Sequence, residues 1–195
     1  MIPLLFLILL LIVFNISYFS SYSNYGELII NEVMSKNTYT IGLDGEYYDY
    51  IELYNGYGYD IDLSGYYLSD NEYETNIWKF PKIIIKSKEY LVIFASGKDR
   101  CNDNVCHTNF KLSSSGEVVT LTNDVGTIIS KISYQGSMND TSYGYNGRKY
   151  VYYEKGSPGV KNSGNTSNEP IGLSNKKIPV YINEYMSNNQ RFMTD

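Results

Sequence analysis

Apolar and polar residues alternate along most of the chain in short stretches that are separated by turn-forming residues. The alternation is plain in Ile51-Glu52-Leu53 and in Val119-Thr120-Leu121, and a period of two is the signature of a β-strand with one buried face. Pairs such as Ser64-Gly65 and Asn146-Gly147 are typical of tight turns. The pattern predicts strands at residues 28–34, 50–55, 65–68, 77–80, 90–95, 117–122, 128–134, 142–145 and 150–153.

Short strands at this spacing, with no amphipathic helix between them, favour two antiparallel sheets packed face to face. We therefore expect an all-β domain with the architecture of an immunoglobulin-like β-sandwich. The pattern does not determine the order of the strands within the sheets.

The first residues differ from the rest, because every position from 2 to 14 is apolar and polar residues follow from Asn15. A bilayer crossing needs about 20 apolar residues, so this stretch suits the apolar region of a secretory signal better. We interpret residues 1–23 as a signal peptide. The alternative is an uncleaved apolar helix that anchors the protein in the membrane. Both interpretations place the protein outside the cell or on its surface.

The composition changes again after Pro158-Gly159, where Asn, Ser, Gly and Thr dominate. We expect the domain to span residues 27–162 and a flexible linker to span residues 163–179. The stretch Ile-Asn-Glu-Tyr-Met-Ser-Asn-Asn (182–189) then repeats residues 30–37, with changes only at Tyr185 and Asn188. A repeat of this kind indicates a second copy of the domain, so residues 180–195 are interpreted as its truncated start.

The two cysteines, Cys101 and Cys106, lie close together in a polar segment. In an exported protein such a pair is expected to form a local disulfide. The alternative is a metal site with His107, the only histidine, but zinc sites usually need four ligands.

Composition and charge narrow the range of functions. The chain has a net charge of −5, and its 16 basic residues are outnumbered by 21 acidic ones. Nucleic-acid binding depends on Lys and Arg that neutralise phosphates, so the charge argues against it. The chain also has 22 tyrosines, and tyrosine favours strands and half-buried positions.

Several motifs occur in a characteristic order. They are Ile-Asn-Glu-Val-Met-Ser (30–35), Asp-Tyr-Ile-Glu-Leu-Tyr-Asn (49–55), Ile-Asp-Leu-Ser-Gly-Tyr-Tyr-Leu-Ser-Asp (61–70), Trp-Lys-Phe-Pro (78–81), Tyr-Leu-Val-Ile-Phe-Ala-Ser-Gly-Lys-Asp-Arg (90–100), His-Thr-Asn-Phe-Lys-Leu-Ser-Ser-Ser-Gly-Glu (107–117), Ser-Tyr-Gly (142–144) and Ser-Pro-Gly (157–159).

With these motifs, the chain resembles the secreted type of lamin-tail domain. One departure is Tyr50, where the family often has Trp. The resemblance implies an immunoglobulin-like sandwich that serves adhesion or targeting, and it implies no catalytic role shared across the family. Secreted relatives commonly accompany CotH-type kinases, nucleases, hydrolases or anchoring modules. Fold alone does not settle function.

An acidic cluster formed by Asp44, Glu46 and Asp49 is a candidate calcium site, because calcium prefers carboxylate and carbonyl oxygens on a flexible loop. Its spacing is not that of a calcium-binding hand loop. The alternative is an ordinary polar turn that leads into a strand. No other cofactor is expected.

Candidate catalytic residues are few. Glu32 and Glu52 lie within apolar strands and are a possible acid–base pair. A buried Glu in a sandwich more often accepts hydrogen bonds from turn backbone. His107 lies near the serine run 113–115, but the surrounding sequence lacks the Gly-x-Ser-x-Gly pattern of a nucleophile elbow. We therefore expect no enzyme active site in this chain.

The remaining candidate is a set of tyrosines whose side chains are expected to divide between the core and a binding face for protein or carbohydrate. The set comprises Tyr47, Tyr48, Tyr50, Tyr54, Tyr57, Tyr59, Tyr66 and Tyr67. The favoured hypothesis is a non-catalytic interaction or adhesion module of an exported protein that binds a protein or a cell-surface polymer. The alternative hypothesis is an N-terminal accessory region of a larger secreted enzyme, such as a CotH-type kinase or a hydrolase.

The calcium hypothesis predicts a ligand-dependent melting temperature. Binding to the folded state alone stabilises that state, so the chain is expected to melt at a higher temperature with calcium than with a chelator. Differential scanning fluorimetry measures this shift, with Asp44→Asn as the control that abolishes it. Equal melting temperatures in calcium and in chelator would rule out the site.

Overall fold

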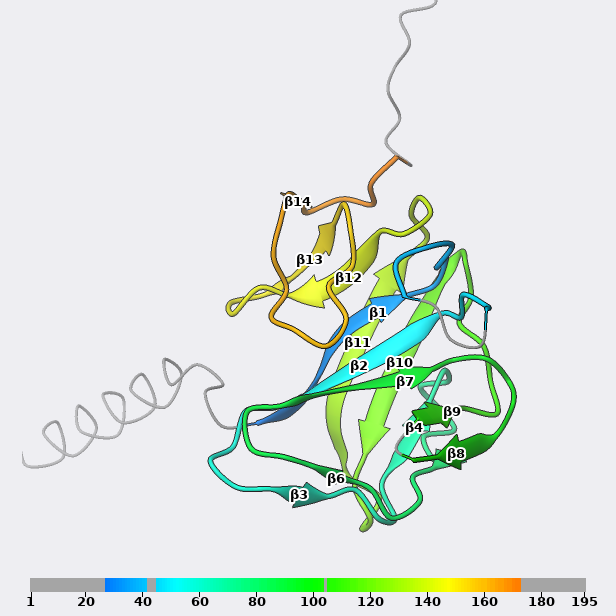
Figure 1. Ribbon diagram of the computed structural model, residues 1–195, viewed down its shortest axis with the longest axis vertical. Helices are drawn as coiled ribbons and strands as arrows, with labels where there is room; N and C mark the ends of the chain where they lie inside the picture. Colours follow the sequence, from blue (N-terminus) through cyan, green and yellow to red (C-terminus); the bar gives the residue numbers. More distant parts are fainter. Residues whose placement is uncertain (1–26, 42–44, 104, 173–195) are drawn as a thin grey trace, which may run out of the picture.

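The computed structural model describes residues 27–41, 45–103 and 105–172 (Figure 1). These residues form strands, turns and loops and contain no helix. The strands are β1 (Leu28–Met34), β2 (Tyr50–Asn55), β3 (Ile61–Asp62), β4 (Tyr67–Ser69), β5 (Trp78–Lys79), β6 (Ile84–Ile85), β7 (Tyr90–Phe94), β8 (Arg100–Asn102), β9 (Val105–His107), β10 (Gly116–Thr122), β11 (Ile128–Gln135), β12 (Ser142–Tyr145), β13 (Tyr150–Tyr153) and β14 (Thr166–Ser167).

The strands form two main sheets and one small ribbon. The larger sheet has the order β14-β13-β12-β1-β2-β7-β9-β8, and the smaller has the order β11-β10-β4-β5. Every pairing is antiparallel except that of β7 with β9. The ribbon pairs β3 with β6 at the lower end of the molecule (Figure 1). The all-β sandwich expected from the hydrophobic pattern is confirmed.

The core lies between the two main sheets and draws apolar side chains from both. Ile51 and Ile93 come from the larger sheet, and Val119 and Leu121 come from the smaller one; all four are fully buried. These are the apolar positions of the alternating patterns, so the period of two identifies the inward face of each strand.

Strand β1 departs from simple alternation. Its pairing with β2 shifts between Ile30 and Glu32, which is the mark of a β-bulge. The extra residue lets Ile30 and Val33 both point into the core, although their spacing would put them on opposite faces of a regular strand. The bulge also frees Asn31 and Glu32 for polar contacts. All seven residues of β1 are buried, because both faces of the strand are covered.

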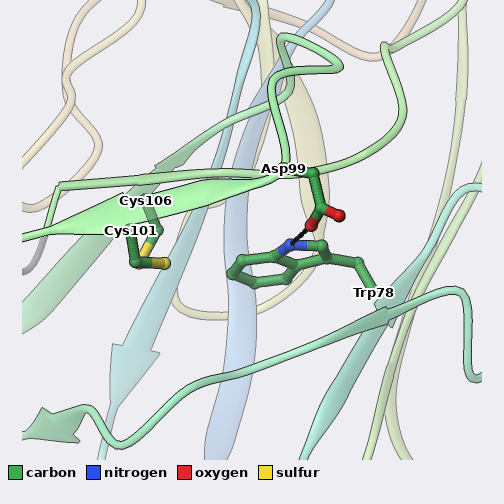
Figure 2. The surroundings of a disulfide bond; sticks show 4 residues. All are labelled: Trp78, Asp99, Cys101 and Cys106. Atoms are coloured by element: carbon green, nitrogen blue, oxygen red, sulfur yellow. Dashed lines mark hydrogen bonds between the residues drawn. A yellow bond between two sulfur atoms is a disulfide. The ribbon is translucent and has the colours of Figure 1, made fainter.

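A disulfide joins Cys101 and Cys106, as expected. The two residues lie directly opposite each other in the hairpin of β8 and β9. Figure 2 shows the disulfide beside Trp78, whose indole Nε1 donates a hydrogen bond of 3.2 Å to Asp99 Oδ1. The disulfide excludes a metal site that uses both cysteines as thiolate ligands.

The larger sheet has an edge strand, β14, that the sequence did not suggest. Strand β14 pairs with β13 and lies within residues 163–179, the range expected to be a flexible linker. The larger sheet therefore extends past the expected boundary at Asn162. The strands β3, β6, β8 and β9 were also not expected, because each has only two or three residues.

Three expectations lie outside the described residues, namely the apolar leader at 1–23, the end of the linker and the repeat at 180–195. Within the described residues, no helix has the length and apolar character needed to span a membrane.

Removal of the disulfide tests its structural role. The double variant Cys101→Ser with Cys106→Ser is expected to lose about 2 kcal/mol of unfolding free energy, because closure of this short loop no longer restricts the unfolded chain. Trp78 fluorescence can follow the unfolding, since it is the only tryptophan and packs in the same core cluster as the cystine.

Reductant supplies the control for this experiment. It should lower the stability of the wild-type chain to that of the double variant and leave the variant unchanged. A wild-type chain that reductant does not destabilise would contradict the assignment.

Candidate functional site

Glu32, one of the candidate catalytic carboxylates, is fully buried and surrounded by donors. Tyr50 donates its hydroxyl to Glu32 Oε2 at 2.5 Å, and Ser142 donates to Oε1 at 2.6 Å. The backbone N–H of Ser157 adds a third donor, 3.1 Å from Oε2. Burial raises the pKa of Glu32, and these hydrogen bonds oppose that rise.

Glu52 lies opposite Glu32 in the pairing of β1 with β2 and is also fully buried. Asn31 donates its side-chain amide to Glu52 Oε1 at 2.7 Å, and the backbone N–H of Gly159 donates to Oε2. Burial is the main cause that raises the pKa of Glu52 to about 8, and the charge of Glu32 adds to it. The hydrogen bonds from Asn31 and Gly159 oppose this rise, because they stabilise the charged carboxylate.

Both carboxylates accept hydrogen bonds from one segment of the chain, residues 156–162, which we call the closing segment. Asn162 completes the attachment, because its amide donates to the carbonyl oxygens of Asn31 at 3.1 Å and Tyr145 at 3.0 Å. Gly156 allows the close approach, since a Cβ there would lie 2.3 Å from the Tyr50 hydroxyl oxygen. The closing segment seals both carboxylates from water. Glu32 and Glu52 therefore serve the fold, as the hydrogen-bonded alternative predicted.

Sequence reasoning identified the two Glu residues and the Ser-Pro-Gly motif separately but not the contact between them. It did not identify Asn31, Ser142 or Asn162 as partners. No local pattern reveals these partners, because more than 100 positions separate Glu32 from Ser142 and Asn31 from Asn162.

His107 is also buried, and its ring packs against other side chains of the domain. Its Nδ1 lies 2.8 Å from Ser96 Oγ, and its ring stacks on Phe94 with centroids 5.4 Å apart. Tyr48 packs edge-on against the same ring. The imidazole is only 1% exposed, so a substrate cannot reach it without a rearrangement of the fold.

The acidic loop proposed for calcium is described only in part, because Asp44 lies outside the described residues. Glu46 is exposed. Asp49 accepts a hydrogen bond of 3.2 Å from the backbone N–H of Asn37, and burial raises the pKa of its carboxyl group. Among the described residues, no group of three or more His, Cys, Asp or Glu side chains is arranged to hold a metal ion. The calcium site stays a prediction.

A groove of about 590 Å³ lies in the surface of the described residues, at the end of the sandwich that carries the β3–β6 ribbon. Its lining is aromatic and acidic, and we call it the tyrosine groove. Residues that define it are Tyr57, Tyr59, Tyr66, Glu27, Asp60 and Ile129.

Only part of the expected aromatic set reaches this groove. Tyr57 and Tyr59 stack with centroids 5.0 Å apart and an interplanar angle of 25°, and Tyr59 is 61% exposed. By contrast, Tyr50 is buried against Glu32, and Tyr54 pairs with Tyr90 on the neighbouring strand. The tyrosines after β2 thus form the surface feature, while those within β2 belong to the sheet.

Asn55, the last residue of β2, fixes the loop that carries these rings. Its buried amide donates to the carbonyl oxygen of Tyr59 at 2.9 Å and to that of Ile85 at 3.1 Å. Its Oδ1 accepts the backbone N–H of Tyr57 at 3.0 Å. Because one buried side chain holds both sides of the loop, Tyr57 and Tyr59 are positioned before any ligand binds.

The loop is also attached, through Gly56, to the residue that precedes β1. The Gly56 backbone N–H donates to the carbonyl oxygen of Glu27 at 2.8 Å, and a Cβ at this position would lie 2.8 Å from the same oxygen. The chain therefore needs glycine at position 56 for this close backbone approach. Asp60 adds a further link, because its Oδ1 accepts the backbone N–H of Ser87 at 2.9 Å.

The family model described as Lamin Tail Domain matches residues 21–136, which is more than half of the chain. The chain belongs to the lamin tail domain family. A comparison with curated proteins finds no match.

Membership explains the order of the sequence motifs and the sandwich that they form. The lamin tail domain is an immunoglobulin-like, generally non-catalytic interaction domain. The match ends within the segment after β11, so β12, β13 and the closing segment lie beyond it. These later elements nevertheless complete the larger sheet of this lamin tail domain.

The raised pKa of Glu52 predicts a specific pH dependence of stability. Between the ordinary value of 4.5 and about 8, the folded chain holds a proton that the unfolded chain has released. Each pH unit in this range lowers the unfolding free energy by up to about 1.4 kcal/mol. The contribution of Glu52 to stability is therefore largest below pH 4.5 and is lost as the pH rises to 8.

Glu52→Gln removes the titration and keeps an oxygen that can accept the Gly159 N–H. The unfolding free energy of the wild type minus that of this variant is expected to fall between pH 5 and pH 8 in urea titrations. Glu74→Gln, at an exposed position, is the matched control and should follow the wild type. A constant difference between wild type and Glu52→Gln would contradict the prediction.

Proposed function

We propose that this lamin tail domain is a non-catalytic interaction module of an exported protein and binds a protein or polymer ligand in the tyrosine groove. The observation that supports the proposal most directly is the preorganised aromatic surface of Tyr57 and Tyr59. Aromatic side chains supply large contact areas with little loss of conformational freedom, which makes them effective binding anchors.

The environment of the candidate catalytic residues supports a non-catalytic role. Glu32 and Glu52 are buried and accept hydrogen bonds from the closing segment and from neighbouring strands. His107 is packed between aromatic rings. A general acid or base must be within reach of a substrate, and these three groups lie beneath other parts of the chain.

Export is proposed on two grounds. Residues 1–23 have the composition of a secretory signal. The cystine of Cys101 and Cys106 suits an oxidising compartment, because cytosolic thiols are normally kept reduced. The accessory role in a larger secreted enzyme stays a prediction from the family resemblance.

Substitution of Tyr59 tests the groove as the binding site. The full chain is incubated with a glycan and peptide microarray. Tyr59→Ala is expected to weaken retention on the bound class by about fivefold, in line with the loss of one exposed aromatic anchor. Tyr59→Phe should retain most of the binding because it keeps the ring.

Tyr73→Ala is the matched control, because Tyr73 is 89% exposed and does not line the groove. It should bind like the wild type. Binding that is unaffected by Tyr59→Ala, or absent for every class on the array, would refute the proposed site.

A further inference from the structure

We propose that the ligand of the tyrosine groove is a basic polypeptide segment that inserts a lysine or arginine side chain between the tyrosine rings and the groove carboxylates. This inference rests on the proposed function and specifies the chemistry of its ligand.

The charge of the groove favours a cationic ligand. Glu27 and Asp60 are among its lining residues, and no Lys or Arg is among the described residues of its lining. Asp124 lies close enough to Tyr66 that its charge helps to raise the pKa of that phenol, after the effect of burial. The residues that line the groove therefore carry a net negative charge, which favours a cationic ligand.

The aromatic rings of the groove favour a cationic ligand as well. A cation is attracted to the face of a tyrosine ring when it lies within about 6 Å of the centroid. Tyr59 presents one face to solvent, because its other face stacks on Tyr57. The same molecule already contains this geometry, since Lys98 Nζ lies 4.3 Å from the ring centroid of Tyr48.

The combination of rings and carboxylates distinguishes between ligand classes. A neutral polysaccharide can stack on Tyr59, but it leaves the charges of Glu27 and Asp60 without a counter-ion as the groove loses water. Burial of an unpaired charge is costly. A lysine or arginine side chain packs its methylene groups against Ile129 and Leu28 and places its charge beside the carboxylates.

The loop that carries the tyrosines is held by hydrogen bonds, which lowers the entropic cost of binding. The hydrogen bonds of Asn55 fix Tyr57 and Tyr59, and the bond from Ser87 fixes Asp60. The bonds of Asn55 hold the backbone of this loop, so a ligand does not bear the entropic cost of ordering that backbone, which allows a short segment to bind measurably.

The experiment measures the fluorescence anisotropy of labelled deca-lysine and deca-arginine peptides with the full chain, with a Gly-Ser decapeptide as the neutral probe. Both basic peptides are expected to bind and the neutral peptide is not. The affinity should fall when NaCl is raised from 50 to 300 mM, because salt screens the carboxylates.

Two charge-matched double variants separate a specific site from general attraction to an acidic protein. Glu27→Gln with Asp60→Asn is expected to weaken binding at least fivefold, while the asparagine keeps an oxygen to accept the Ser87 N–H. Glu74→Gln with Glu169→Gln removes the same charge from exposed positions outside the groove and should weaken binding less than twofold. Tyr59→Ala should weaken binding about threefold or more, as expected for the loss of a cation–π contact.

Equal losses for the two charge variants would overturn the inference, because binding would then depend on overall charge alone. Retention of a neutral polysaccharide in place of the basic peptides, with sensitivity to Tyr59→Ala, would overturn the inference and leave the proposed function intact. No binding of any probe, together with no effect of Tyr59→Ala on the array, would refute both.

Discussion

The burial of two carboxylates in the middle of the larger sheet is the constraint on which the rest of the structure depends. Glu32 and Glu52 face each other across β1 and β2 with no exposed surface. Isolated charges at such positions would destabilise the fold severely. The sandwich tolerates them because the N–H groups of the closing segment, together with Tyr50, Ser142 and Asn31, supply donors.

This requirement links the two ends of the domain. Two of the donors, the backbone N–H groups of Ser157 and Gly159, follow β13, whereas the acceptors lie in the first two strands. The sheet is therefore completed only when the last part of the domain lies across the first. Asn162 reinforces the link through its bonds to β1 and to the end of β12. The part of the chain beyond the family match is thus integral to the fold.

The same requirement, that buried polar groups form hydrogen bonds, also determines the structure of the tyrosine groove. Asn55 is fully buried, and every bond that it makes is to a backbone group of the surrounding loops. The bonds of this amide hold the loop backbone that carries the rings of Tyr57 and Tyr59. A group that stabilises the end of a strand therefore also builds the candidate binding surface.

Much of the fold was predictable because it depends on local periodicity. The ranges of β1, β2, β12 and β13 agree with the predicted strands, and the cystine joins the expected pair. The short strands β3, β6, β8 and β9 were missed, since two or three residues do not establish a period. Of the expected aromatic set, periodicity did not separate Tyr50, which packs against Glu32, from Tyr59, which lines the groove.

The sequence by itself determined that the chain is a β-sandwich of the lamin-tail type, because alternation, turns and ordered motifs are properties of neighbouring residues. Only the tertiary structure decided what the polar residues do. Glu32 contacts Ser157, Asn55 contacts Ile85, and Gly56 contacts Glu27 through the packing of separate segments. Such contacts depend on the packing of the whole domain. The stability of a buried charge or amide depends on its hydrogen-bond partners, and partners from distant segments cannot be identified from the local sequence.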